Sequence, residues 1–448
     1  MTLRVSPQTR RVFRLSLPIF AELLLQLLVG NVDQFMLSGI GSEAVAAVGN
    51  GNQVMNVVII VLETVSAATT ILLTQHIGAG RTGETCNEIA TVGVAVSGVF
   101  SLLMGLILLL APHLLFGLLR TPAEAFDGAC LYTRIVGGAV LIQGLYIELC
   151  AILRSYTLLK EVVAASVVMN LVNVAGNVLL INGLLGLPRL GVVGAAIATC
   201  LSKAVGLGLV LWVLRRKCRV RFSTRHLRPF PAATCKRMLG IAMPSGTEAL
   251  SYNVSQIVIL RFINLMGTTV IATKVYASML ANVAYVYAIA VSQATQIIIG
   301  YMLGAKRYGE VERRVWSTIR ISLLVSELLT LVIFLFCDPI YSIFTRDPAI
   351  HTLGRQIVLV EFSLEIGRSV NITMTKALTA AGDVWYPVIV GIFSMWLVAV
   401  LGGWLLGSVL QWGLVGIWIA MACDEGLRGA LFVGRFHRGA WRNKQLVD

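Results

Sequence analysis

The sequence predicts an all-α membrane protein, with twelve transmembrane helices in two pseudo-twofold-related six-helix bundles and both termini in the cytoplasm. Three observations support this fold class: the composition, the spacing of the apolar segments and an internal repeat. Of the 448 residues, 57% are hydrophobic and only 13% are charged, and the mean hydropathy is +0.83. Soluble domains carry about 25% charged residues. This chain therefore has too little polar surface to face water on all sides.

The apolar segments have the length that a bilayer requires. A helix needs about 20 predominantly apolar residues to cross the hydrocarbon core. The segments of this kind are 12–38, 45–75, 88–112, 130–154, 162–184, 191–214, 237–263, 270–302, 314–337, 354–379, 384–407 and 412–435. Because 45–75 and 270–302 exceed this length, we expect them to tilt or to extend beyond the bilayer.

The positive charges predict the orientation. The net charge is +14, and the segment 215–237 alone carries nine Lys and Arg residues. Cations gather in the even-numbered connectors, and Lys and Arg retained on one side of a membrane mark the cytoplasmic side. A basic chain can also bind nucleic acid, but no soluble domain is present to display such a patch. We therefore expect no nucleic-acid partner.

The chain also repeats itself at an interval of 226 residues. The shift places Pro18 on Pro244, Glu22 on Glu248, and GAGRTGE at 78–84 on GAKRYGE at 304–310. Near the end of each half the shift becomes 222, which places Gly191 and Gly194 on Gly413 and Gly416. Two six-helix halves inserted the same way up are related by an axis along the membrane normal.

The repeat predicts three parts: an N-terminal lobe at 1–214, a basic cytoplasmic linker at 215–236 and a C-terminal lobe at 237–448. A cleft between the lobes is the natural place for a substrate, and two packed lobes without a cleft are the alternative. The chain has no Gly-Lys dipeptide, hence no Walker A loop for ATP, and no H-E-x-x-H or G-x-S-x-G motif. We therefore expect no cofactor and no enzyme activity, and movement that is passive or driven by an ion gradient.

Asp33 is the first candidate for coupling to an ion. A charge at mid-bilayer costs about 2.5–3.5 kcal/mol on insertion scales, so ionisable residues in spans are functional candidates. No Lys or Arg lies within helical reach of Asp33. An unpaired carboxylate in low dielectric can bind a proton near neutral pH, or it can give its oxygens to Na⁺. The alternative is a solvated, inert carboxylate near the external end of the helix.

Polar residues of the fifth and sixth spans complete this hypothesis. Asn173 and Asn177 share one helix face at i, i+4, and Thr199 offers a hydroxyl from the next span. The amides can hydrogen-bond a carboxylate or give oxygens to a cation, so Asp33, Asn173 and Asn177 form a candidate Na⁺ site. The alternative is polar contact between helices, which membrane proteins use routinely.

Two acids lie beside prolines in corresponding positions of the repeat. Glu22 and Glu248 each follow a proline, Pro18 or Pro244, by four residues. A proline inside a helix frees a backbone carbonyl and permits a kink. Facing carboxylates in a central cleft would attract cations, whereas the alternative is a structural carboxylate beside each kink. For Glu365 and Arg368, the i, i+3 spacing favours mutual neutralisation over transport.

These residues together resemble the multidrug and toxic compound extrusion (MATE) family. The resemblance rests on Pro18 followed by NVDQFMLSGIGSEAVAAVGN, on GAGRTGE after the second span, and on N-x-x-x-N with LGVVGAAIAT. It extends from about residue 10 to 435, and it implies twelve spans in two bundles. It also implies export of amphipathic, cationic organic compounds in exchange for H⁺ or Na⁺.

The resemblance implies that Asp33 matches the first-helix acid of the coupling site, with Asn173, Asn177 and Thr199 around it. Asn177 replaces an Asp found in some relatives, and Tyr252 stands where one subgroup carries a Glu, with Glu248 one turn away. A coupling site in the C-terminal lobe is therefore not transferred, and Glu248 and Tyr252 are kept with Glu22 as candidates for the substrate cleft.

The expected partners and location follow from the same resemblance. We expect a monomer in the cell membrane, with a small organic molecule as substrate and the lipid bilayer as surroundings. A flippase for a lipid-linked substrate is the alternative function, since such exporters share the helical plan. They need cations to line the cavity for anionic headgroups, whereas the candidate residues here are acidic.

Overall fold

The computed structural model describes residues 7–183, 186, 188–218, 220–444 and 446, and these form helices and loops without strands. Within this range, the side chains of residues 7–11, 13 and 27–35 lie outside the description. The all-α class is therefore confirmed for the described residues.

The chain divides into two compact units. The N-terminal unit comprises residues 21–243, and the C-terminal unit comprises residues 1–20 and 244–448. Helices α1 (Pro7–Ser38) and α9 (Ala232–Asn264) contribute to both units. The division in α1 falls shortly after Pro18, and the division in α9 falls at Pro244.

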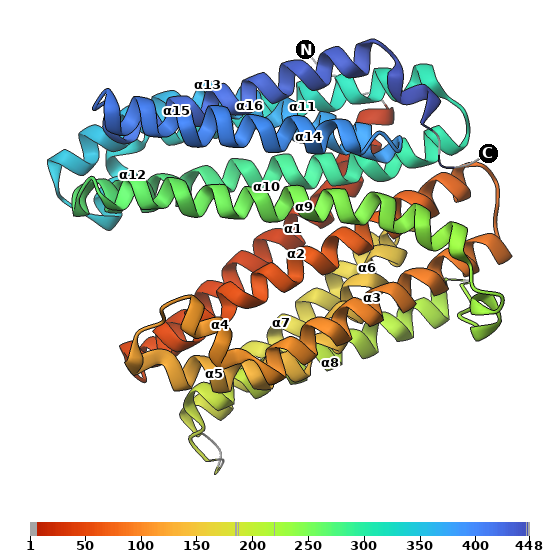
Figure 1. Cartoon of the computed structure of the whole chain (residues 1–448), viewed down its shortest axis with the longest axis horizontal. Helices are drawn as coiled ribbons and strands as arrows, with labels where there is room; N and C mark the ends of the chain where they lie inside the picture. The colour runs from red at the N-terminus through yellow and green to blue at the C-terminus, as the bar shows by residue number, and fades with distance from the viewer. Residues whose placement is uncertain (1–6, 184–185, 187, 219, 445, 447–448) are drawn as a thin grey trace. The chain divides into compact units, whose positions relative to one another are not determined.

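The other elements of the N-terminal unit follow α1 in chain order (Figure 1). They are α2 (Ser42–Gly78), α3 (Glu84–Leu110), α4 (Pro112–Leu118), α5 (Ala123–Gly138), α6 (Val140–Ser155), α7 (Leu159–Asn182), α8 (Gly191–Lys217) and the 3₁₀ turn η1 (Thr224–Leu227). Its main apolar core lies among α2, α3, α5, α6 and α8, around side chains such as Leu62, Leu108 and Val140.

The C-terminal unit continues after α9. Its elements are α10 (Thr268–Gly304), α11 (Tyr308–Leu335), α12 (Cys337–Phe344), α13 (Pro348–Ala380), α14 (Trp385–Ser394), the π-helical η2 (Met395–Val400), α15 (Leu401–Trp404), the π-helical η3 (Leu405–Val409), α16 (Gly413–His437) and the 3₁₀ turn η4 (Ala440–Asn443). Helix α13 packs against α10, α11 and α16, so side chains from these four helices meet inside the unit.

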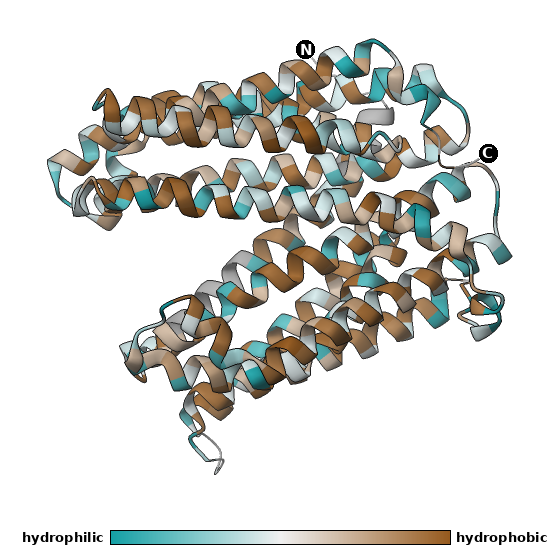
Figure 2. Cartoon of the chain, viewed as in Figure 1, coloured by the Kyte–Doolittle hydropathy of each residue, from teal (hydrophilic) through white to brown (hydrophobic). Residues whose placement is uncertain are grey.

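Several described helices can cross a membrane. Seven are long and apolar enough, and there are eight if α5 and α6 form one bent span. Figure 2 shows hydrophobic residues along these helices, with hydrophilic residues concentrated in the connecting segments. Helices α2 and α10 have 37 residues each, which confirms that these two spans are long. The total of twelve spans and the cytoplasmic position of the termini stay predictions.

The fourth span differs from the single helix predicted at 130–154. The chain bends by 52° between α5 and α6, at Ala139. A Cβ added to Gly137 would lie 2.7 Å from the Cβ of Leu108, and one added to Gly105 would lie 3.0 Å from the Gly137 carbonyl oxygen. The glycine pair Gly137–Gly138 therefore allows α5 to approach α3 closely, and glycines are common at helix kinks.

The repeated G-x-x-G sequences have a structural explanation. Gly191 and Gly413 open α8 and α16 with φ values of +55° and +60°, a region that glycine occupies without steric cost. The second glycine of each pair approaches a backbone. A Cβ on Gly194 would lie 2.6 Å from the Leu180 carbonyl oxygen, and one on Gly416 would lie 2.8 Å from that of Leu406.

We expect Gly194→Ala and Gly416→Ala each to lower the free energy of unfolding by about 1–3 kcal/mol, the usual range for overpacking. The added methyl group meets backbone atoms, which cannot rotate away. Thermal unfolding in detergent measures the effect. Gly98→Ala on α3 is the control, because a Cβ there meets nothing within 4 Å. Unfolding midpoints for Gly194→Ala and Gly416→Ala equal to that of Gly98→Ala would contradict this explanation.

Candidate functional site

The N-terminal unit brings three of the predicted coupling residues together. Asn173 and Asn177 of α7 are buried, with 5% and 1% exposure. Asn177 Nδ2 donates to Asn173 Oδ1 at 3.4 Å, and Asn173 Nδ2 donates to Thr199 Oγ1 of α8, also at 3.4 Å. The Thr199 hydroxyl donates to the Ala195 carbonyl at 2.9 Å. A chain of neutral polar groups thus connects the two helices.

Small residues explain why α7 and α8 approach so closely at this point. A Cβ on Gly176 would lie 2.9 Å from the Cβ of Ala198. Gly176 precedes Asn177 and Ala198 precedes Thr199. The close contact therefore holds the polar side chains within hydrogen-bonding reach of one another.

Asp33 lies on α1, but its side chain is outside the described residues. Its predicted contact with Asn173 and Asn177 therefore stays a prediction. The described side chains contain no group of three or more His, Cys, Asp or Glu residues that could hold a metal ion. From these helices, Na⁺ would find the neutral oxygens of Asn173, Asn177 and Thr199 as ligands.

Glu22 has an ion-pair partner that its sequence position does not reveal. Arg154 Nη2 of α6 lies 2.6 Å from Glu22 Oε1, and the Glu22 side chain is 4% exposed. The pair joins residues 132 positions apart. Because Arg154 neutralises Glu22, a cation that binds Glu22 has to compete with this arginine.

Its repeat mate Glu248 has different surroundings. Glu248 of α9 is half-buried, and a Cβ on Gly391 of α14 would lie 2.8 Å from its Oε1. It interacts electrostatically with Arg428, Lys376 and Glu425. The pseudo-symmetry of the sequence therefore does not extend to the ion pairs of these two acids.

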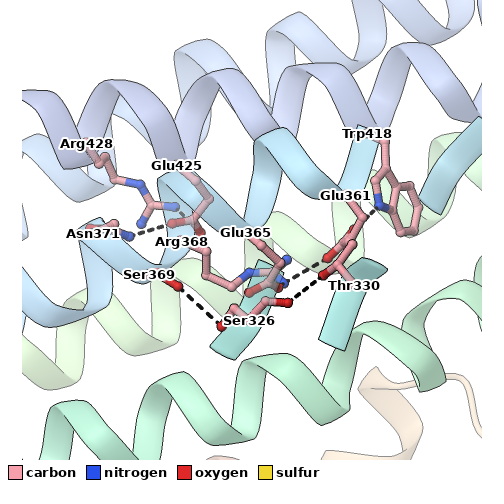
Figure 3. A network of polar contacts seen from close by, with 10 residues as sticks. All are labelled: Ser326, Thr330, Glu361, Glu365, Arg368, Ser369, Asn371, Trp418, Glu425 and Arg428. Atoms are coloured by element: carbon pink, nitrogen blue, oxygen red, sulfur yellow. Dashed lines mark hydrogen bonds and ion pairs between the residues drawn. The ribbon is translucent and has the colours of Figure 1, made fainter. Parts of the chain in front are cut away.

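The polar network in Figure 3 surrounds two arginines of the C-terminal unit, the half-buried Arg368 and the buried Arg428. Arg368 Nη1 on α13 lies 3.0 Å from Glu361 Oε1, and it also pairs with Glu365. The pairing at i, i+3 confirms the neutralisation expected from the spacing. Trp418 Nε1 of α16 donates to Glu361 Oε2 at 2.7 Å. The Arg368 guanidinium also lies over the Tyr285 ring, 5.4 Å from its centroid.

Arg428 of α16 forms the second half of this network. Its Nη2 lies 2.5 Å from Asp424 Oδ2 and 2.9 Å from Glu425 Oε1. Ser394 Oγ donates to Asp424 Oδ1 at 2.5 Å. Asn371 Nδ2 of α13 donates to Glu425 Oε2 at 2.6 Å and so connects the two helices.

A glycine contact between α13 and α16 brings these groups together. A Cβ on Gly367 would lie 2.6 Å from the backbone nitrogen of Gly426 and 2.9 Å from the carbonyl carbon of Glu425. Only a glycine allows the two backbones to come this close. Gly367 directly precedes Arg368 in the sequence, so the contact also fixes where Arg368 enters the network.

Tyr252 of α9 is half-buried and interacts electrostatically with both halves of the network, through Arg368, Arg428 and Glu425. A small pocket beside Glu361 and Thr330 is otherwise lined by apolar side chains of α10, α11 and α13. The predicted candidates Glu248 and Tyr252 thus lie among charges from α13 and α16.

Acidic groups outnumber basic groups in this region. The carboxylates are Glu248, Glu361, Glu365, Asp424 and Glu425. The cations that pair with them or interact with them electrostatically are Arg368, Arg428 and Lys376. Two carboxylates are thus in excess of these cations. Excess negative charge in a low-dielectric interior is costly unless protons or cations neutralise it. The region can therefore bind either.

Sequence reasoning missed Asp424, Glu425 and Arg428. A signal was present, because the segment DEGLR at 424–428 places two acids at i−4 and i−3 from an arginine inside an apolar span. It also missed Arg154 as the partner of Glu22 and the hydrogen bond from Asn371 to Glu425, which no local spacing indicates.

Comparison with known proteins agrees with the fold and the repeat. The chain matches the MatE family model twice, over residues 18–179 and 244–405, and the two matches begin at the interval of the internal repeat. It is 31% identical over 440 residues to the "Uncharacterized transporter YisQ" of Bacillus subtilis (strain 168), which covers 98% of this chain and 96% of that protein. It is 26% identical over 457 residues to the "Probable multidrug resistance protein NorM" of Thermotoga maritima, over 98% and 95% of the two chains.

A solved structure described as "Crystal structure of MATE in the bent conformation" has a similar fold. The TM-score is 0.89 at 22% sequence identity, over 98% of this chain and 97% of that one. The family model matches well over half of the sequence, and a relative more than 30% identical extends over nearly all of it. The chain therefore belongs to the MATE family of membrane transporters.

Proposed function

We propose that this chain is a secondary active antiporter that exports amphipathic, cationic organic compounds in exchange for H⁺ or Na⁺. The family consists of transporters rather than enzymes. A relative that aligns over nearly its whole length is named a probable multidrug resistance protein. The proposed location is the cell membrane, where the chain acts as a monomer on small organic molecules, without nucleic acid or a bound cofactor.

The proposal of a cationic substrate rests on the excess of buried and half-buried acids around Arg368 and Arg428. Five carboxylates meet three cationic side chains there. An organic cation entering such a region replaces a missing counter-charge, whereas an anion would be repelled. Glu248 and Tyr252 are the proposed substrate contacts in this unit, and Glu22, through its pair with Arg154, is the proposed contact in the other.

The coupling ion is proposed to bind in the N-terminal unit. Asp33 is the proposed ligand or proton acceptor, and the hydrogen-bonded chain of Asn177, Asn173 and Thr199 supports it. The lobes at 1–214 and 237–448, joined by the linker at 215–236, would alternate access to the two sides of the membrane. Pro18 and Pro244 lie where α1 and α9 pass from one compact unit to the other, which suits them to act as hinges.

The lipid-linked alternative is not proposed. An anionic headgroup requires cationic side chains in excess, whereas the network around Arg368 and Arg428 has more carboxylates than cations. The name of the NorM relative also refers to multidrug resistance.

Asp33→Asn tests the coupling proposal. We expect the variant to insert into membranes normally, because the amide has the size of the carboxyl group. Gradient-driven export should fall to the level of protein-free vesicles, because an amide neither binds a proton nor supplies a charge. The measurement is efflux of a fluorescent lipophilic cation from proteoliposomes under an imposed H⁺ or Na⁺ gradient, which also identifies the ion.

Glu124→Gln is the matched control for this experiment. Glu124 is an exposed acid in the first turn of α5, so its neutralisation should leave export unchanged. Full export by Asp33→Asn would remove Asp33 from the mechanism. Export by the normal protein without any gradient would exclude antiport.

A further inference from the structure

Glu148 of α6 is a buried carboxyl group that the proposed mechanism does not use. Its exposed fraction is 0%. Ser66 Oγ of α2 donates to its Oε2 at 2.8 Å. Its other oxygen, Oε1, lies beside the Thr69 hydroxyl but outside good hydrogen-bond geometry. The carboxyl group therefore has one oxygen in a firm hydrogen bond and one without such a bond, in the interior of the unit.

No charged group neutralises Glu148. Within the part of the chain that the structure describes, neither an ion pair nor a hydrogen bond joins it to a charged side chain. Helix α2 presents the hydroxyls of Ser66 and Thr69, α3 presents Gly93, and Met238 of α9 contacts the Thr69 hydroxyl at 3.8 Å. These surroundings contain no titratable group.

The titratable neighbours on α6 itself point elsewhere. Tyr146 and Cys150 lie two residues before and after Glu148, and residues at i, i+2 do not share a helix face. Burying an isolated ionised carboxylate costs far more than burying a neutral one. The geometry therefore favours the protonated, neutral form of Glu148.

The unsatisfied oxygen has an acceptor in reach once it carries a proton. A Cβ on Gly93 would lie 2.4 Å from Glu148 Oε1 and 2.6 Å from Thr69 Oγ1, so both oxygens lie beside the same point on α3. A protonated Oε1 can donate to the Thr69 hydroxyl. The Thr69 hydroxyl can also donate to an ionised Oε1, but that hydrogen bond supplies no counter-charge. Protonation removes the buried charge and keeps Thr69 as a hydrogen-bond partner.

The repeat supplies an internal comparison. Ser66 and Thr69 correspond to Ser292 and Thr295 at the 226-residue interval. In the C-terminal unit, Ser292 bonds the Thr373 hydroxyl at 3.1 Å and Thr295 bonds the Thr318 hydroxyl at 2.9 Å. Neutral hydroxyl pairs therefore satisfy the same two positions there. A carboxyl group is not needed to pack this pair of hydroxyls, so its presence in the N-terminal unit calls for another role.

We propose that Glu148 is a proton-binding site of the N-terminal unit. It is protonated while α2, α3 and α6 pack as described, and it loses its proton when the contact with Ser66 opens to water. In that step the O–H bond of the carboxyl group breaks, the proton passes to water, and the electron pair stays on the carboxylate. A role of Glu148 in export depends on the proposed antiport, with H⁺ as the coupling ion. The binding of a proton by Glu148 does not depend on that proposal.

Infrared spectroscopy of the purified protein in lipid vesicles tests the bound proton. At neutral pH we expect a C=O stretching band of a protonated carboxylic acid that is lost in Glu148→Gln. The amide in this variant keeps an acceptor for Ser66 and a donor for Thr69, so the unfolding midpoint should stay unchanged. Glu124→Gln, at an exposed acid, should lose no such band. Identical bands in the normal protein and Glu148→Gln would overturn the proposal.

Transfer to D₂O tests whether this proton exchanges. We expect the Glu148 band to shift as a deuteron replaces the proton, because opening of the Ser66 contact admits water. A band that is present but does not shift would show a permanently closed structural carboxyl group and would overturn the exchange. Asp33→Asn should keep the Glu148 band while losing export, so a failure of the antiport proposal remains distinguishable from a failure of this one.

Discussion

Replacing Arg428 with Met is expected to lower the free energy of unfolding by about 3–5 kcal/mol, the usual cost of removing one partner of a buried ion pair. The Arg428 side chain is 6% exposed, and its partners Asp424 and Glu425 are 4% and 14% exposed. Met retains much of the apolar volume of the arginine but leaves two acids without their counter-charge. Thermal unfolding in detergent should show a large drop in the midpoint, together with a low yield of folded protein.

A matched control separates burial from the loss of a positive charge. Arg307→Met removes an arginine that pairs with Glu310, where the two side chains are 60% and 36% exposed. Exposed pairs contribute only about 0–1 kcal/mol, so this variant should unfold almost normally. Adding Asp424→Asn and Glu425→Gln to Arg428→Met should recover part of the lost stability, because the stranded charges are removed. Equal losses in the two single variants would contradict the buried network.

Gly367→Val is expected to separate α13 from α16 and to disable the site in the C-terminal unit. A Cβ at this position would lie 2.6 Å from the Gly426 nitrogen, closer than real Cβ contacts, and the obstructing atoms are backbone. Overpacking of this kind costs about 1–3 kcal/mol and is relieved by moving the helices apart. The hydrogen bond of 2.6 Å from Asn371 to Glu425 would then lengthen. We therefore expect both a lower unfolding midpoint and loss of cation export in proteoliposomes.

The control for this prediction is Gly434→Val on α16. A Cβ at Gly434 meets no atom within 4 Å, so the same substitution on α16, the partner helix of α13, adds no clash. Stability should be unchanged or slightly higher, because valine has a better helix propensity than glycine. A Gly367→Val protein that keeps normal export would show that the close approach of α13 and α16 is dispensable.

Local spacing predicted the contacts that arise within one helix. Glu365 and Arg368 pair as their i, i+3 interval indicates, and Asn177 bonds Asn173 at i, i+4. The fixed geometry of the α-helix places such residues on one face whatever surrounds them. The bend at Ala139 was missed because an apolar run through Gly137 and Gly138 is compatible with one straight span.

Contacts between helices could not be predicted in this way. Glu22 and Glu248 occupy equivalent positions in the repeat, yet Glu22 forms an ion pair with Arg154, whereas the carboxyl group of Glu248 packs against Gly391. Which side chains meet depends on how each helix is rotated and how closely its neighbours approach. Single glycines such as Gly367 and Gly194 set that approach. Because a glycine in a span can also serve a turn or a kink, its presence in the sequence does not identify a close helix contact.

The sequence by itself determined that this protein lies in a membrane, that it contains an internal repeat and that it belongs to this family. A chain with few charges and long apolar runs has to bury its backbone in helices that cross a bilayer, and duplication leaves its trace in the order of residues. Only the tertiary structure decided the chemistry of the buried acids. It paired Glu22 with Arg154, gathered the acids of α13 and α16 around two arginines, and placed Glu148 beside the hydroxyls of Ser66 and Thr69. The physical reason is that the state of a buried carboxyl group depends on the charges and donors within a few ångströms, and these come from helices far apart in the sequence.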